Sequence, residues 1–391
     1  MINQKMYDLG SCRSCIRELF EYGQMRRAEG HTVLDFSLGN PSVPAPEAVN
    51  HAIRSLLDSC PSTLLHGYTS ASGGADAKSA VAADLNARFD AGIRPGDLFL
   101  GCGAAPELVS VIRALAVKDS EFVVIAPFFP EYRPFVESSG GKIRIVPADV
   151  PAFQLNLSAV EQALNEHTQA LILNSPNNPS GTVYTEQTLR ALAALLTEKS
   201  RQFGHPIYIL SDEPYRELCY DGKTAPWIPA LYPDTIVCYS WSKSLSLPGE
   251  RIGYVCVPPQ AGDHDALLAA VAGAARSIGH VCAPSLMQQV VARCAGVRPD
   301  LAAYDHNRRL LADSLRAFGY EMASPDGAFY LFVRAPGGDS EAFSEKARQQ
   351  DLLIVPGTDF GCREYFRLCY CVTEDTIRQS LPVFKALIDN S

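Results

Sequence analysis

Side chains that can do chemistry follow three successive apolar runs in the middle of the chain. The run ending at Asn174 leads to the amide of Asn178, and the next run ends beside the carboxylate of Asp212. The third leads to the amine of Lys243, and the guanidinium of Arg251 follows eight residues later. Because the carboxyl ends of parallel strands meet at one edge of a sheet, we expect these groups to lie together.

A glycine-rich segment adds a predicted anion site at the same edge. Gly101-Cys-Gly103-Ala104-Ala105 follows another apolar run and precedes a helical pattern, so its backbone N–H groups would bind an anion. The third glycine of the dinucleotide fingerprint is absent. Each feature alone is typical of a turn or a solvated side chain, so the prediction rests on their order and spacing. Together they match an aldehyde cofactor that carries a phosphate, pyridoxal 5′-phosphate.

The elements that would position these groups alternate between strand and helix. Apolar runs without polar alternation suit strands covered on both faces; they lie at 98–101, 122–126, 143–146, 170–174, 207–211, 235–239 and 252–257. Helical patterns at 106–116, 157–164 and 186–201 separate some of these runs, and Ser158-Ala-Val-Glu161 is a capping-box pattern. The alternation predicts an α/β fold with a mostly parallel sheet. The last two runs are joined too closely for a crossover helix, so they are antiparallel or not adjacent.

The C-terminal third has a different pattern and predicts a smaller α+β domain. Long helical patterns at 299–318 and 373–389 enclose apparent strands at 330–333 and 365–371. The N-terminal segment has no alternating strands and helices around it and could join this lobe. We therefore expect an N-terminal segment at 1–45, a large cofactor-binding domain at 46–285 and a small domain at 286–391. Small ligands usually bind in the cleft between such lobes.

Composition excludes several classes of protein. The net charge is −9 and there is no basic run, so we expect no nucleic-acid partner. No apolar stretch is long enough to span a membrane, and the N-terminus lacks a signal-peptide core. The twelve cysteines are scattered, and neither Cys12-x-x-Cys15 nor Cys369-x-Cys371 has a second pair at zinc spacing. We interpret them mainly as structural thiols of a reducing, cytoplasmic protein without a metal site, although a role for Cys12 and Cys15 stays open.

Short motifs occur along nearly the whole chain: Asp35-Phe-Ser-Leu-Gly39, His66-Gly67-Tyr68, Asn178-Pro-Ser-Gly181, Asp212-Glu-Pro-Tyr215, Ser240-Trp-Ser-Lys243, Gly249-Glu-Arg251-Ile-Gly253, Gly327-Ala-Phe-Tyr330, Val355-Pro-Gly357 and Phe366-Arg367-Leu. In this order they resemble the class I/II aminotransferases, pyridoxal-phosphate enzymes of fold type I. The resemblance implies a large domain with a mostly parallel seven-stranded sheet flanked by helices, and a smaller α+β domain. It also implies transfer of an amino group between an L-amino acid and a 2-oxo acid.

The resemblance assigns roles to the residues at the predicted sheet edge. Lys243 would form the internal Schiff base and then move the proton between the substrate α-carbon and the cofactor's C4′. Asp212 would keep the pyridine nitrogen protonated, which makes the ring an electron sink. Tyr215 and Asn178 would hydrogen-bond the phenolic oxygen at C3. Phe129 would stack on the ring, where relatives more often have tryptophan or tyrosine.

The remaining implied contacts hold the phosphate and the substrate. The phosphate would be bound by Ala104 and Ala105 amides, Ser240, Ser242 and Arg251, although relatives often carry a polar residue near Ala104 or Ala105. Arg367 would bind the substrate α-carboxylate through its planar fork, which lysine cannot copy, and Gly39 would let the chain approach that group. Tyr68 would reach the phosphate of the neighbouring subunit in a homodimer.

Some alternatives stay open. The same scaffold supports lyases, cyclising synthases and decarboxylases, because a fold does not fix the chemistry. A ligand sensor on this fold usually carries a DNA-binding module, and neither end of the chain shows one. A nicotinamide dehydrogenase would need the missing glycine fingerprint. Arg276 either reads a side-chain carboxylate of the substrate or only ends a helix, so the amino donor and the 2-oxo acid acceptor stay unnamed.

Overall fold

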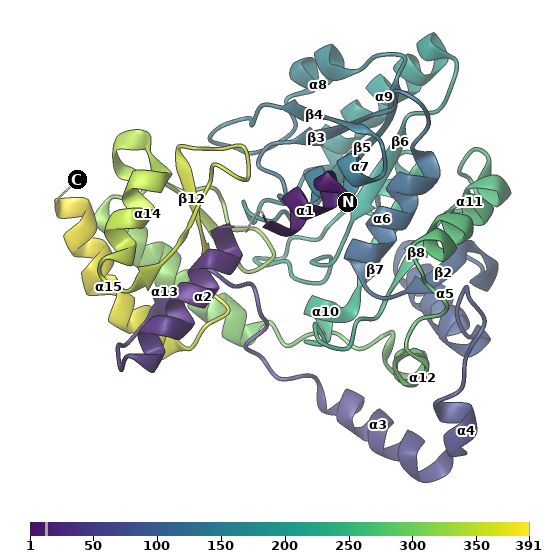
Figure 1. Ribbon diagram of the computed structural model, residues 1–391, viewed down its shortest axis with the longest axis horizontal. Helices are drawn as coiled ribbons and strands as arrows, with labels where there is room; N and C mark the ends of the chain where they lie inside the picture. Colours follow the sequence, from purple (N-terminus) through teal and green to yellow (C-terminus); the bar gives the residue numbers. More distant parts are fainter. Residues whose placement is uncertain (12–14, 391) are drawn as a thin grey trace.

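The computed structural model describes residues 1–11 and 15–390. Figure 1 shows two lobes, a larger one built around a seven-stranded sheet and a smaller one that contains the C-terminus. Helix α2, near the N-terminus, lies in the smaller lobe with the C-terminal helices α13, α14 and α15 (Figure 1). No helix among the described residues has the length and apolar character that crossing a membrane requires.

The large sheet has the strand order β2-β8-β7-β6-β5-β3-β4. Strand β8 is antiparallel to both neighbours, and the other pairs are parallel. The last two predicted strands are therefore adjacent and antiparallel. The strands are β2 (Leu98–Gly101), β3 (Glu121–Ile125), β4 (Lys142–Val146), β5 (Thr168–Asn174), β6 (Tyr208–Asp212), β7 (Thr235–Ser240) and β8 (Gly253–Cys256).

Helices cover both faces of this sheet, which explains why the strands lack polar alternation. In β3, Phe122 and Val124 pack into one core cluster, whereas Val123 and Ile125 pack into another on the opposite side. Successive strand residues point to opposite faces, so a strand covered twice must be apolar throughout. The helices of the large lobe are α3 (Glu47–Ser59), α4 (Ser62–Leu65), α5 (Ala75–Phe89), α6 (Ala104–Leu115), α7 (Tyr132–Ser138), α8 (Leu157–Ala163), α9 (Glu186–Phe203), α10 (Trp241–Ser244), α11 (His264–Ser277) and α12 (Ser285–Cys294).

The small lobe combines the C-terminal part of the chain with a segment near the N-terminus. Its antiparallel sheet has the order β11-β12-β9, and β1 near the N-terminus pairs in parallel with β10. The strands are β1 (Leu34–Asp35), β9 (Tyr330–Arg334), β10 (Leu352–Leu353), β11 (Val355–Pro356) and β12 (Tyr365–Cys369). The helices of this lobe are α2 (Cys15–Ala28), α13 (Ala302–Phe318), α14 (Ser340–Arg348) and α15 (Glu374–Asp389). Helix α1 (Gln4–Ser11) lies over the large lobe instead (Figure 1), where Lys5 donates to the Glu137 carbonyl of α7.

The start of α8 and the limits of the domains were both expected from the sequence. The capping box at Ser158 is wrong: α8 begins at Leu157, and the side chain of Asn156 caps it by accepting from the Ala159 amide at 3.1 Å. Asparagine is among the best N-caps, so the helix starts before Ser158. The expected domain limits at 45 and 285 stay a prediction, and α12, which begins at Ser285, packs against α3 and α5.

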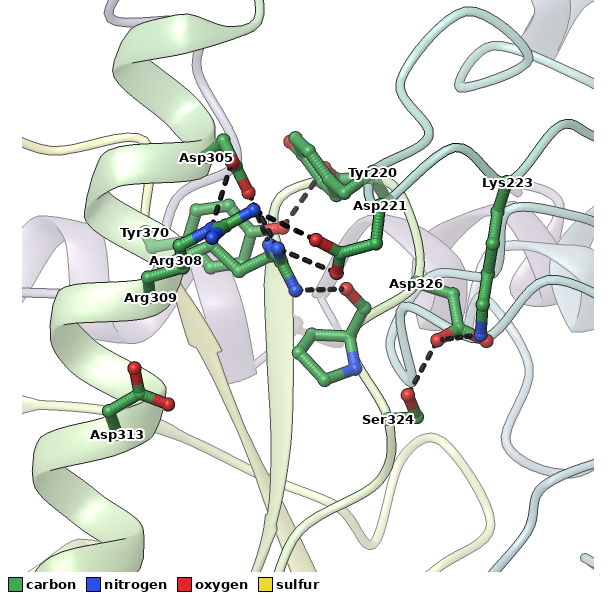
Figure 2. Close-up of polar contacts among 12 residues, drawn as sticks. Tyr220, Asp221, Lys223, Asp305, Arg308, Arg309, Asp313, Ser324, Asp326 and Tyr370 are labelled. Atoms are coloured by element: carbon green, nitrogen blue, oxygen red, sulfur yellow. Dashed lines mark hydrogen bonds and ion pairs between the residues drawn. The ribbon is translucent and has the colours of Figure 1, made fainter.

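Charged residues of the loop after β6 and of α13 join the two lobes. Asp221 follows β6, and Figure 2 shows it facing two arginines of α13. Arg308 Nη2 lies 2.8 Å from Asp221 and 2.6 Å from Asp305, while Arg309 contacts the same two carboxylates. The Arg308 guanidinium also lies over the ring of Tyr220, 4.9 Å from its centroid. We call Asp221, Asp305, Arg308 and Arg309 the interlobe ion cluster.

Candidate active site

A cavity of about 290 Å³ lies at the carboxyl ends of β5, β6 and β7. This is where ligands bind in open α/β sheets. Residues of the small lobe and the N-terminal segment also line it. Apart from Tyr68 and the alternative candidate Arg276, every predicted site residue lines this cavity: Gly39, Ala104, Ala105, Phe129, Asn178, Asp212, Tyr215, Ser240, Ser242, Lys243, Arg251 and Arg367.

Lys243 lies in the short helix α10, directly after β7. Its Nζ donates to the carbonyl of Gly39 at 2.6 Å and lies 5.5 Å from the centre of the Phe329 ring. Burial lowers the pKa of the Lys243 amine, because the charged form loses its water. The side chain is thus held in the cavity in a setting that favours the free amine, the form that attacks a carbonyl carbon.

Asp212 ends β6 and has one carboxylate oxygen free to face a ligand. Its Oδ2 accepts from the hydroxyl of Tyr132 at 2.6 Å, whereas its buried Oδ1 has no partner among the described residues. Burial raises the pKa of Asp212 to about 7, the neighbouring Glu213 adds to the shift, and the bond from Tyr132 opposes it. An unpaired carboxylate oxygen at such depth is costly, and a cationic N–H donor such as a protonated pyridine would satisfy it.

Tyr215 and Tyr330 form a phenol pair beside Gly39. Their hydroxyl oxygens are 2.9 Å apart. A Cβ at position 39 would collide with the hydroxyl of Tyr330, so glycine is required there by a close approach. Tyr330 belongs to a motif of the resemblance, but the sequence assigned it no role.

Arg367 lies on β12 and is held rigidly in the small lobe. Nη1 donates to Asn178 Oδ1 at 3.0 Å, and Nη2 donates to the Ser37 carbonyl at 2.6 Å. Its guanidinium also lies 4.7 Å from the centre of the Tyr330 ring. The buried Nε has no partner among the described residues. A buried arginine fixed in this way is suited to bind an organic carboxylate.

The N-terminus of α6 and Arg251 form the predicted anion site. Gly103 precedes α6 with φ +97°, and a Cβ there would lie 2.6 Å from Arg251 Nη2, so the guanidinium rests against this backbone. Arg251 has φ +50°, in the left-handed region that is unfavourable for arginine. Its Nη1 donates to Ser242 Oγ at 3.4 Å and to the Pro248 carbonyl at 2.9 Å. Helix dipole, backbone amides, hydroxyls and one guanidinium therefore converge on one point, as a phosphate requires.

Two predicted residues lie outside the cavity. Tyr68 is 89% exposed and borders a separate hollow with Leu64 and Gln288, so it is not a core tyrosine. Arg276 is exposed near the end of α11 and does not line the cavity. Cys12 lies outside the described residues, whereas Cys15 is a free thiol near the start of α2.

The structure adds residues that sequence reasoning missed. Tyr132 supports Asp212, and Asn174 Nδ2 donates to the Asp212 carbonyl while its Oδ1 accepts from the Asn178 amide. Ile16 and Leu38 line the cavity from the N-terminal segment. Asn174 ends a predicted strand, which was a usable signal; Tyr132, Ile16 and Leu38 carry none in the sequence alone.

Comparisons with known proteins agree with this geometry. A family model described as "Aminotransferase class I and II" matches residues 31–383. The chain is 27% identical to the aspartate/prephenate aminotransferase of Thermus thermophilus, over 93% of this chain and 92% of that protein. It is also 27% identical to the aspartate aminotransferase of Bacillus subtilis, over 93% of each.

Solved structures extend the likeness to three dimensions. An aminotransferase from Eubacterium rectale superposes with a TM-score of 0.98 at 49% identity, covering 100% of this chain and 99% of that one. The aspartate aminotransferase of Thermus thermophilus with maleate superposes with a TM-score of 0.87 at 25% identity, covering 99% of both chains.

Proposed function

The chain belongs to the class I and II aminotransferases and is a pyridoxal-phosphate-dependent aminotransferase, and we propose which of its residues carry out the transfer. The observation that supports the proposal is that Lys243, the unpaired oxygen of Asp212 and Arg367 share one cavity. When bound there, pyridoxal phosphate supplies an aldehyde for the amino group and a ring that accepts electrons from the substrate α-carbon.

Lys243 is the proposed covalent anchor and proton carrier. Its amine is partly buried and is held in the cavity by a hydrogen bond to the Gly39 carbonyl. After substrate binds, Nζ would take the proton from the α-carbon and deliver it to C4′ of the cofactor. Lowering of the Lys243 pKa by burial makes Nζ a better proton acceptor at neutral pH than a solvated lysine would be.

The other residues hold the reactants around Lys243. Asp212 would keep a proton on the ring nitrogen, with Tyr132 fixing its orientation. Tyr215 and Asn178 would contact the phenolic oxygen, and Phe129 would cover one face of the ring. Arg367 would bind the α-carboxylate, with Gly39 close by.

The proposed phosphate site combines backbone and side-chain donors. The amides of Ala104 and Ala105 begin α6, and Ser240, Ser242 and Arg251 line the same end of the cavity. The two alanines offer no side-chain donor, so their contribution rests on the backbone N–H groups and the helix dipole.

Reduction with borohydride tests the assignment of Lys243. The purified protein should be yellow, and borohydride should fix the cofactor onto Lys243 as the only labelled lysine. Lys243→Ala should still bind cofactor but lose turnover, whereas Lys142→Ala, an exposed lysine on β4, should behave as the wild type. A label on any other lysine would overturn the proposal.

The cavity favours an amino donor with an apolar side chain in at least one half-reaction. Among the described residues that line it, the cationic groups are Lys243, Arg251 and Arg367, and each already has a proposed partner. Ile16 and Leu38 instead offer apolar surface. A second substrate carboxylate would find no further cation among the described residues that line the cavity, and burying it unpaired would be costly.

Conversion of the cofactor to its amine form by single amino acids measures this preference. We expect kcat/KM for leucine or phenylalanine to exceed that for aspartate by at least ~10-fold, in keeping with ~1–3 kcal/mol for side-chain recognition in a pocket. A 2-oxo acid should then restore the aldehyde form. Faster reaction of aspartate would show that a cation reaches the site from elsewhere, such as a second subunit.

We further propose that the enzyme is a homodimer whose sites are completed across the interface. Tyr68 and Leu64 are exposed around a hollow of about 610 Å³, and Tyr68 is outside the cavity of its own subunit. A phenol that donates to a partner's cofactor phosphate would form a charge-assisted hydrogen bond. In a two-fold dimer each subunit would give one Tyr68 and receive one.

A further inference from the structure

A buried glutamate lies beneath the predicted phosphate site without any role in the reaction described above. Glu107 is in the first turn of α6 and is 2% exposed. Neither carboxyl oxygen has a well-aligned hydrogen-bond partner among the described residues, and the donors close to it are the backbone amides of Gly103 and Gly101, which favour the charged form and partly oppose the effect of burial on its pKa. A buried carboxylate without a partner is strongly unfavourable.

Two glycines make room for this carboxyl group. Gly101 of β2 and Gly253 of β8 are direct partners in the sheet. A Cβ on Gly101 would lie 2.5 Å from Glu107 Oε1, and a Cβ on Gly253 would lie 2.8 Å from Oε2. The carboxyl group therefore fills a space that exists only because both paired strand positions lack a side chain.

The charges around Glu107 come from four directions. Arg251, on the loop before β8, attracts a negative charge, and Asp212 at the end of β6 repels one. Cys238 of β7 and Cys102, on the loop before α6, are the other titratable neighbours. Burial outweighs Arg251, so the pKa of Glu107 is raised well above its usual value.

We propose that Glu107 is protonated and uncharged beneath the cofactor's phosphate, and that loss of this proton weakens the protein's hold on the cofactor. The inference rests on the proposed phosphate site. A bound phosphate monoester carries a charge of about −1.5 to −2 at neutral pH. Arg251 is the one guanidinium among the described residues of the cavity's phosphate end, and an ionised Glu107 would offset its attraction. Glu107 is thus a positioning residue, because it acts through Arg251 and the backbone of α6.

The sign of the pH effect follows from this arrangement. At low pH the carboxyl group is neutral and the phosphate meets only positive charge and N–H dipoles. As pH rises, cofactor-free protein loses the Glu107 proton first, since a nearby phosphate disfavours ionisation. Binding the cofactor must then restore that proton, so affinity falls as pH increases.

The test compares cofactor affinity of the wild type with that of Glu107→Gln, which has the same shape and no charge at any pH. The apoenzyme is titrated with pyridoxal phosphate at pH 6.5 and pH 9.5. At pH 6.5 we expect the two proteins to have similar dissociation constants for the cofactor. At pH 9.5 the wild-type dissociation constant should be at least ~10-fold higher than that of the variant, because binding that must restore a lost proton weakens ~10-fold for each pH unit above the pKa of that group. Pyridoxal without phosphate should show no such difference, and neither should Glu121→Gln, a glutamate at the start of β3 outside the cavity.

Other outcomes distinguish a failure of the Glu107 inference from a failure of the proposed function. Equal pH dependence in wild type and Glu107→Gln, or weaker binding by the variant already at pH 6.5, would overturn the inference. Failure of the cofactor to attach to Lys243 would instead overturn the proposed function. If Glu107→Gln does not fold, Glu107→Leu is a second uncharged variant. Infrared spectroscopy of the holoenzyme at pH 7 gives a second measurement: the wild type should show the C=O band of a protonated carboxyl group that is missing from the uncharged Glu107 variant, and identical spectra in this region would contradict the proposal.

Discussion

Asp212 is a buried carboxyl group that would gain a charged partner only when the cofactor binds. It is buried, one of its oxygens has no partner among the described residues, and burial raises its pKa to about 7. In cofactor-free protein the folded state therefore keeps a proton that the unfolded chain loses near pH 4. Stability of the apoenzyme should fall as pH rises from about 4 to 7 and then level off.

Asp212→Asn tests both consequences of this arrangement. In the wild-type apoenzyme, the free energy of unfolding should fall by a few kcal/mol between pH 4 and 7, at ~1.4 kcal/mol per pKa unit. In the variant apoenzyme this fall should be much smaller. Chemical denaturation at several pH values measures both. In the holoenzyme, kcat should fall at least ~100-fold, because the ring nitrogen loses its charged partner. A near-wild-type kcat would mean that another group holds that proton.

Hydrogen bonds hold the guanidinium of Arg367 in one orientation. The planar shape of this group should therefore contribute to substrate binding as much as its charge does. Arg367→Lys keeps the charge but loses the fork held by Asn178 and Ser37. We expect kcat/KM to drop for every amino acid by roughly 1.5–3 kcal/mol, the range for hydrogen bonds to charged groups. Amines without an α-carboxylate should be much less affected. A loss confined to one class of side chain would show that Arg367 reads the side chain instead.

Among the elements, α13 and the loop after β6 connect the lobes through the interlobe ion cluster. Arg308 and Arg309 bind the same two aspartates, but their side chains are 9% and 59% exposed. Removing the more buried arginine leaves two carboxylates facing each other with less solvent, so its loss should cost more.

The variants Arg308→Met and Arg309→Met test whether the more buried arginine contributes more to stability. We expect Arg308→Met to lower the free energy of unfolding by ~2–3 kcal/mol, below the range for fully buried pairs because Asp221 is half exposed. Arg309→Met should cost less than ~1 kcal/mol, as is usual for surface ion pairs. Urea denaturation measures both. Equal losses would indicate that burial of Arg308 contributes nothing to the connection.

At the scale of the whole molecule, the exposed position of Tyr68 raises the question of whether a second subunit completes the active site. If Tyr68 acts on the partner's cofactor, Tyr68→Phe should weaken cofactor binding by roughly 1.5–3 kcal/mol. Mixing Lys243→Ala with a strongly impaired Tyr68 variant should then restore activity. Both defects fall on one site of each hybrid dimer, and the other site is intact.

The control for this experiment uses two defects that act in the same subunit. Lys243→Ala mixed with Asp212→Asn should give no recovery, because each hybrid site keeps one defect. No recovery with the Tyr68 variant would place Tyr68 in its own subunit, and a fully active monomer at micromolar concentration would disprove the dimer proposal.

The sequence by itself was sufficient for the seven strands of the large sheet and for most of the residues that line the cavity. Buried parallel strands are continuous apolar runs, and catalytic groups at strand ends are close together by topology alone. Asn178, Asp212, Lys243 and Arg251 could therefore be placed together from spacing, and the family resemblance added Arg367 and Gly39.

Tertiary structure decided what depends on contacts between distant segments. The bond from Tyr132 to Asp212 joins residues 80 positions apart, and that from Arg367 to Asn178 joins residues 189 apart; no local periodicity encodes either. The orientation of β8 was open for the same reason. Nothing in the sequence singled out Glu107, and only its packing over Gly101 and Gly253 shows that it is buried, without a well-aligned partner among the described residues. Local propensity fixes elements, whereas burial and partners are properties of the folded chain as a whole.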